Sequence, residues 1–117
     1  MAQFQNLNVW KLAHELVLDV YRITKKFPAD EKYRLTDQIC RAAASVPMNI
    51  SEGTGRSTDK DLANFLCIAR GSLYEVQYQL ILARDLGYLD EKGFADLSAK
   101  CDNIGRKLNA FIRKLRS

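Results

Sequence analysis

The feature that most constrains the fold is an apolar stripe that recurs at alternating steps of four and three residues. In the third predicted helix it continues without a slip through Leu62, Leu66, Ala69, Leu73, Val76, Leu80 and Ala83. This spacing places apolar side chains on one face of an α-helix, and strand-like alternation does not occur. Equivalent stripes elsewhere predict an all-α chain with helices over about 8–27, 30–53, 58–86 and 91–115.

Residues that end and begin helices lie between these stripes. Pro28 stops the first predicted helix, Gly53 and Gly55 end the second, and Gly87 ends the third. The expected N-caps of the later helices are Asp30 or Thr36, Ser57 or Thr58, and Asp90. Connections of about four or five residues are too short to cross a bundle, so neighbouring helices must be antiparallel. The prediction is an up-down-up-down four-helix bundle that forms one domain over 1–117.

Pro47 lies inside the second predicted helix, where its ring crowds the preceding turn and removes one amide donor. We expect a kink there and a freed carbonyl at Ala43. Polar side chains on one side of the second and third helices are candidates to satisfy such groups: Arg41, Ser45, Asn49, Glu52, Ser72 and Glu75. A hydrogen-bonded network that fixes helix register is the main interpretation, and a ligand site is the alternative.

The third helix carries more apolar residues than one core face can hold. Large side chains outside its stripe are Ile68, Tyr74, Tyr78, Ile81, Leu82 and Leu86, and the first helix adds Trp10, Val17 and Tyr21. Leaving such a side chain in water forgoes roughly 1.5 to 3 kcal/mol. We therefore expect a homo-oligomer, with the six residues of the third helix as candidate interface. The alternative is that a second seam of the bundle absorbs some of them.

The basic excess lies at the carboxyl end. The chain has 18 Lys and Arg against 14 Asp and Glu. No acid accompanies the last five cations: Arg106, Lys107, Arg113, Lys114 and Arg116. These residues are candidates to contact a nucleic-acid backbone, because phosphate neutralisation dominates such binding. The alternative is that they offset the dipole of the last helix.

No catalytic or metal-binding constellation stands out. The single histidine, His14, lacks the Glu-x-x-His partners of a di-iron bundle and faces away from the core stripe. The cysteines Cys40, Cys67 and Cys101 have no metal or redox spacing, and we expect reduced core thiols. Residues 52–57 resemble a phosphate loop but lack its Gly-Lys-Ser/Thr ending and preceding strand, so helix-ending glycines and a cap explain them. We expect no cofactor and no enzymatic activity.

Membrane and secretory classes are also disfavoured. The longest apolar runs are far below the roughly 18 residues of a membrane span. The first seven residues contain neither the basic cluster nor the apolar segment ending in small residues that is typical of a secretory signal peptide. The expectation is a cytoplasmic protein with no membrane partner.

Motifs along nearly the whole chain resemble a known family. They are Phe4, Leu7-x-Val9-Trp10, Phe27-Pro28, Leu35-Thr36-Asp37-Gln38-Ile39, Arg41-Ala42-Ala43-x-Ser45-Val46-Pro47-x-Asn49-Ile50-x-Glu52-Gly53, Gly55-Arg56-Ser57, Phe65-Leu66, Ala69-Arg70-Gly71-Ser72-x-x-Glu75 and Leu86-Gly87-Tyr88-Leu89. The chain is similar to bacterial four-helix-bundle proteins named for reading frames within intervening sequences of 23S ribosomal RNA genes. That resemblance implies an antiparallel bundle that assembles into a ring, typically of five subunits. It extends to the accessory variability protein of diversity-generating retroelements, which is associated with reverse transcriptase and RNA.

The resemblance also assigns expected roles to basic residues. Arg41, Arg56 and Arg70 match family motif positions and could bind nucleic acid, or could join the polar network by pairing with Glu52 and Glu75. A second basic cluster, Arg22, Lys25 and Lys26, adds to the carboxyl-terminal one. Two functions stay open. The first is an oligomeric accessory that binds nucleic acid, with RNA favoured over DNA. The second is a scaffold for a protein partner such as a reverse transcriptase.

Overall fold

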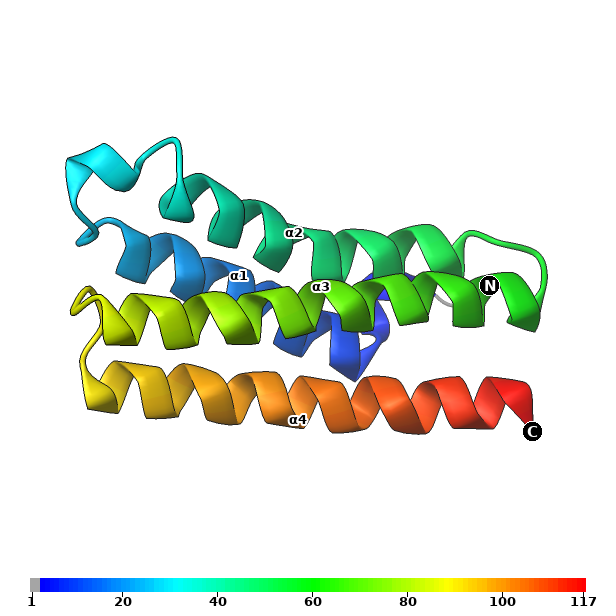
Figure 1. Cartoon of the computed structure of the whole chain (residues 1–117). Coiled ribbons are helices and arrows are strands. Elements are labelled where there is room, and N and C mark those ends of the chain that lie inside the picture. Colours follow the sequence, from blue (N-terminus) through cyan, green and yellow to red (C-terminus); the bar gives the residue numbers. More distant parts are fainter. Residues whose placement is uncertain (1–2) are drawn as a thin grey trace.

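The structure is a computed structural model that describes residues 3–117. Its helices are α1 (Asn8–Thr24), α2 (Leu35–Thr54), α3 (Asp59–Asp85) and α4 (Glu91–Arg116), with short 3₁₀ turns η1 (Phe4–Asn6) and η2 (Ala29–Glu31). Figure 1 shows the four long helices side by side, each running opposite to the one before it. The described chain contains no strand, so the all-α four-helix prediction is confirmed.

Each helix packs against two others, which places the core along the axis of an elongated bundle of 43 × 23 × 20 Å. α1 and α3 each pack directly beside α2 and α4, so α1 and α3 lie diagonally opposite each other. The α3 residues predicted to face the core are buried from Leu66 to Ala83, while Leu62 is half-buried at the edge of the core. The largest fully buried side chains opposite it are Leu16, Ile39, Ile50, Ile104 and Leu108. The apolar residues that recur at steps of four and three therefore form the core.

The connection between α1 and α2 differs from the prediction. α1 ends at Thr24 rather than at 27, although Phe27 still reaches the core through a turn and packs on Tyr88 with ring centroids 5.6 Å apart. α2 begins at Leu35 rather than at 30, because η2 and further turns come first. Neither Asp30 nor Thr36 caps it. The Glu31 carboxylate accepts the Leu35 amide at 3.4 Å and the Tyr88 hydroxyl at 2.8 Å.

The other helix ends follow the expected chemistry. The Thr58 hydroxyl accepts the Asp61 amide at 3.1 Å, and the Asp90 carboxylate accepts the Gly93 amide at 2.7 Å. Gly87 has a φ of +82°, and the next amide, that of Tyr88, donates to the Ala83 carbonyl at 2.8 Å. This bond closes α3 in the way that a glycine in the left-handed region favours.

Pro47 lies inside α2 and is buried. The Ser51 hydroxyl donates to the Pro47 carbonyl at 2.8 Å, so one carbonyl of this turn gains a side-chain donor. The kink expected at Pro47 stays a prediction. Among residues 3–117, no helix has the length and apolar character needed to cross a bilayer.

Candidate nucleic-acid interface and neighbouring polar sites

The carboxyl-terminal cations lie along the solvent-facing sides of α4. Four of them are exposed and Lys107 is half-buried. Six ion pairs link other cations to carboxylates, but none of them involves Arg106, Lys107, Arg113, Lys114 or Arg116 within the described chain. The end of α4 therefore presents charge that no neighbouring side chain neutralises.

The second predicted basic cluster lies at the other end of the bundle. α1 ends near the start of α4, whereas Arg113, Lys114 and Arg116 lie at the far end of α4 (Figure 1). Arg22 is paired with Asp19 at 2.7 Å, and Lys100 of α4 bonds to the same carboxylate. The structure does not bring the two clusters together within one chain.

A groove between α3 and α4 gathers arginines from both helices. Its cavity of about 510 Å³ is lined by Arg70, Asn109, Ile112, Arg113, Arg116 and Ser117. Arg70 Nη1 donates to Asn109 Oδ1 at 2.9 Å, and Arg70 Nη2 lies 3.7 Å from the sulfur of Cys67. Arg116 Nη2 lies 3.5 Å from the same sulfur. Sequence reasoning missed this grouping, because Arg70 lies 39 or more residues from every other residue of the lining.

The polar network expected between α2 and α3 is smaller than predicted. The Ser45 and Ser72 hydroxyls lie 2.7 Å apart, and Asn49 Nδ2 donates to the Ser45 hydroxyl at 2.9 Å and to its carbonyl at 2.8 Å. Arg41 instead contacts Asp37, one turn away on α2, at 3.0 Å. Two other residues expected in this network do not join it: Arg70 bonds to Asn109 of α4, and Glu75 is exposed.

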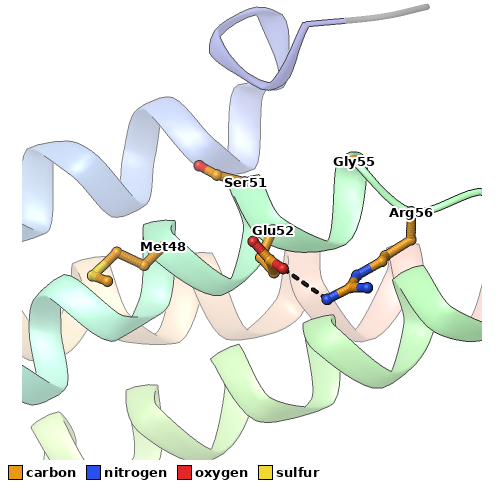
Figure 2. A pocket seen from close by; sticks show the side chains of 5 residues that line it. All are labelled: Met48, Ser51, Glu52, Gly55 and Arg56. Atoms are coloured by element: carbon orange, nitrogen blue, oxygen red, sulfur yellow. Dashed lines mark hydrogen bonds and ion pairs between the residues drawn. The ribbon is translucent and has the colours of Figure 1, made fainter.

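Glu52 and Arg56 form a separate pair at the end of α2. Figure 2 shows the Arg56 guanidinium reaching back to the Glu52 carboxylate, with Nη2 and Oε1 2.7 Å apart. The same guanidinium lies 4.7 Å from the centre of the Phe65 ring. These two residues and Met48 line an open cavity of about 460 Å³. Because Arg56 already has an acid and an aromatic partner, this cavity is less suited to an anion than the α3/α4 groove.

Most of the predicted interface residues of α3 face solvent. Ile68, Tyr74, Tyr78, Ile81 and Leu86 are exposed. Leu82 is a correction: it is half-buried and packs against the core, because the bundle's second seam reaches it. Tyr74, Tyr78 and Ile81 follow Arg70 by one, two and three turns, and we call them the α3 stripe.

A second exposed apolar area lies on α1 and α2. Tyr21 and Met48 are exposed and line a groove of about 470 Å³ together with Cys40, Ala44 and other α2 residues. We call this the α1/α2 face. It adjoins the α2–α3 seam, since Ser45 in its lining contacts Ser72 of α3. The α3 stripe faces another side, because its members lie about 180° to 240° around the helix from Ser72.

The remaining candidates occupy ordinary structural positions. His14 is exposed and stacks on Trp10 with ring centroids 5.2 Å apart. All three cysteines are free, but only Cys101 is a core thiol; Cys40 and Cys67 are half-buried, which corrects the prediction. Burial, reinforced by the nearby Asp102 carboxylate, raises the pKa of the Cys101 thiol to about 12.

Comparisons with known proteins agree with this architecture. A crystal structure of a protein of unknown function, from the S23 ribosomal protein family of Bacteroides thetaiotaomicron VPI-5482, matches with a TM-score of 0.83 and 23% identity. The match covers 89% of this chain and 97% of that one, and it shows a shared fold. No curated protein matches the chain. Residues 5–110 match the family model of the 23S rRNA-intervening sequence protein. Since that match covers most of its length, the chain belongs to the family of 23S rRNA-intervening sequence proteins.

Proposed function

We propose that this protein is a non-enzymatic, cytoplasmic accessory that binds RNA as a homo-oligomer. The observation that carries the proposal is the unneutralised charge at the end of α4, where Arg106, Lys107, Arg113, Lys114 and Arg116 have no carboxylate partner among residues 3–117. Arginine and lysine in this state attract the phosphate backbone and release its counterions on binding. The family's link to 23S rRNA genes favours RNA over DNA as the nucleic acid.

Two apolar areas support assembly into a ring. The α3 stripe and the α1/α2 face lie on different sides of the bundle and differ in composition. When one surface of a subunit fits a different surface of the next, the contact is head-to-tail and closes into a ring if the rotation allows. The family resemblance favours five subunits. Symmetric copies of the basic end would then multiply a weak phosphate attraction.

The test is an electrophoretic shift of labelled single-stranded RNA across a salt series. We expect binding that weakens steeply with salt, with a slope of about −0.7 per phosphate contacted. The variant Arg113→Glu, Lys114→Glu, Arg116→Glu should not bind. A matched variant, Lys11→Glu, Lys32→Glu, Arg34→Glu, changes the net charge equally at exposed positions on α1 and in the α1–α2 connection, and it should still bind. If the unmodified protein does not shift RNA at low salt, the RNA proposal is wrong.

A scaffold for a protein partner such as a reverse transcriptase is the second candidate. The exposed α3 stripe favours it, because contiguous exposed apolar side chains mark protein interaction surfaces. A scaffold would bind its partner equally well after the three charge reversals on α4, whereas an RNA-dependent complex would be lost. Pull-down of a candidate reverse transcriptase with and without ribonuclease separates the two.

A further inference from the structure

We propose that the groove between α3 and α4 is a specific binding site for one phosphate group of an RNA backbone, held by Arg70, Arg113, Arg116 and Asn109. The inference rests on the proposed function for the identity of the polymer, but the anion site itself follows from the geometry below. It differs from the diffuse charge of the α4 end because its groups converge on one cavity of about 510 Å³.

The first support is the fixed position of Arg70. This residue is half-buried, and its guanidinium is oriented by a neutral partner, the side-chain oxygen of Asn109 at 2.9 Å. This hydrogen bond orients the planar guanidinium of Arg70 without neutralising its positive charge. Because the oxygen of Asn109 accepts this bond, its amide N–H groups remain donors for a ligand. A guanidinium held in this way suits the paired oxygens of a phosphate.

The second support is the convergence of Arg70 and Arg116 on Cys67. Their Nη2 atoms lie 3.7 and 3.5 Å from one sulfur atom, although the arginines come from different helices. A thiol is a weak acceptor, so it compensates little of the repulsion between two cations. Arg113 lines the same cavity and adds a third cation. An anion between the three would relieve this repulsion.

The third support is the contrast with other arginines. Arg22, Arg41, Arg56 and Arg84 each contact a carboxylate on their own helix or loop within 3.1 Å. None of the three arginines of the groove has such a partner in the part of the chain that the structure describes. The groove is therefore the place where arginines are both gathered and left uncompensated.

Cys67 lies beside the groove in contact with Arg70 and Arg116, so its reactivity can report whether the groove is occupied. Inorganic phosphate, added at constant ionic strength, should slow the alkylation of Cys67 by iodoacetamide, measured by mass spectrometry of its peptide. Cys40 is also half-buried and serves as the internal control that phosphate should not protect. Arg70→Gln should abolish the protection of Cys67. Arg113→Gln should reduce it without affecting folding, because Arg113 is exposed and only lines the cavity.

The RNA arm uses the same variants. Arg70→Gln should weaken RNA binding about tenfold and lower the salt slope by about one, whereas the paired Arg56→Gln should change neither. Phosphate protection without RNA binding would keep the anion site and overturn the proposed RNA function. The opposite outcome has two parts: Arg70→Gln and Arg113→Gln leave RNA binding unchanged, and phosphate does not protect Cys67. That outcome would overturn the anion site and leave the RNA function standing.

Discussion

The hydroxyl of Ser45 on α2 lies 2.7 Å from the hydroxyl of Ser72 on α3, at the middle of the bundle. Ser72 is only 8% exposed, so its hydroxyl depends on a protein partner. Asn49 completes the group by donating to Ser45. A sliding movement of α2 along α3 by one turn would separate these hydroxyls, so the contact favours one register of the two helices.

Removing the Ser72 hydroxyl should destabilise the protein modestly. Ser72→Ala should lower the free energy of unfolding by about 1 kcal/mol, because one buried hydrogen bond is lost while Ser45 keeps its bond from Asn49. Urea unfolding followed by circular dichroism measures the change. Ser57→Ala, at an exposed position in the α2–α3 connection, is the control and should stay within about 0.5 kcal/mol of the unmodified protein. An equal effect of both variants would contradict a role for the Ser45–Ser72 contact.

A methyl group added at Gly53 should lower the stability of the protein far more than one added at Gly55. A Cβ at Gly53 would lie 2.9 Å from both Leu62 Cδ1 and Phe65 Cβ of α3. A Cβ at Gly55 would meet only the Glu52 carbonyl at 3.5 Å, and its φ of −82° suits any residue. We expect Gly53→Ala to cost about 1 to 3 kcal/mol and Gly55→Ala to cost almost nothing. Thermal unfolding of the two variants side by side makes this comparison.

The helical stripes and the local caps were predictable because they depend on neighbouring residues. Thr58 and Asp90 bond to amides three residues ahead, so a short window of sequence contains the whole interaction. The start of α2 was not predictable in the same way. Its amide partner, Glu31, lies four residues upstream in a separate turn and is also held by Tyr88, 57 residues away.

The candidate site shows the same limit more strongly. Charge counting found Arg113 and Arg116, but no sequence pattern joins them to Arg70, which depends on how α3 and α4 align. The family motif left two alternatives for Arg70, binding to nucleic acid or pairing with an acid inside the bundle. Its partner is instead Asn109, 39 residues away. Tertiary packing decides which of several polar neighbours a long side chain reaches, and periodicity alone does not carry that information.

The buried thiol of Cys101 should make stability depend on pH in the alkaline range. The pKa of the thiol is about 12 in the folded protein against 9.0 for an unperturbed one. Between these values the unfolded state has lost its proton and the folded state has not, so stability falls as pH rises above 9. The thiol's contribution is fully present below that pH. One unit above it, the loss should be about 1.4 kcal/mol.

Comparison with Cys101→Ala separates this effect from other alkaline titrations. The variant should be less stable at neutral pH because it leaves a small cavity, but its stability should fall less steeply between pH 9 and 10. Urea unfolding at several pH values gives both curves. Parallel curves for the two proteins would show that the buried thiol does not titrate as proposed.

Assembly through two different faces makes a prediction that a symmetric dimer does not share. Met48→Lys alters only the α1/α2 face, and Tyr78→Lys alters only the α3 stripe; both side chains are more than 60% exposed, so folding should survive. In a head-to-tail ring, every contact needs one intact copy of each face. Each variant alone should therefore be monomeric, because a lysine is desolvated at every contact.

Mixing the two variants should restore one contact per pair, because the intact α3 stripe of Met48→Lys meets the intact α1/α2 face of Tyr78→Lys. The product should be a dimer that cannot grow, since both of its outer faces carry a lysine. Native mass spectrometry distinguishes this species from the unmodified ring, for which we expect five copies of the 13.3 kDa chain. Tyr33→Lys, in the α1–α2 connection and outside both faces, should assemble normally. A symmetric dimer would behave differently: only one of the two face variants would lose assembly, and the mixture would gain nothing.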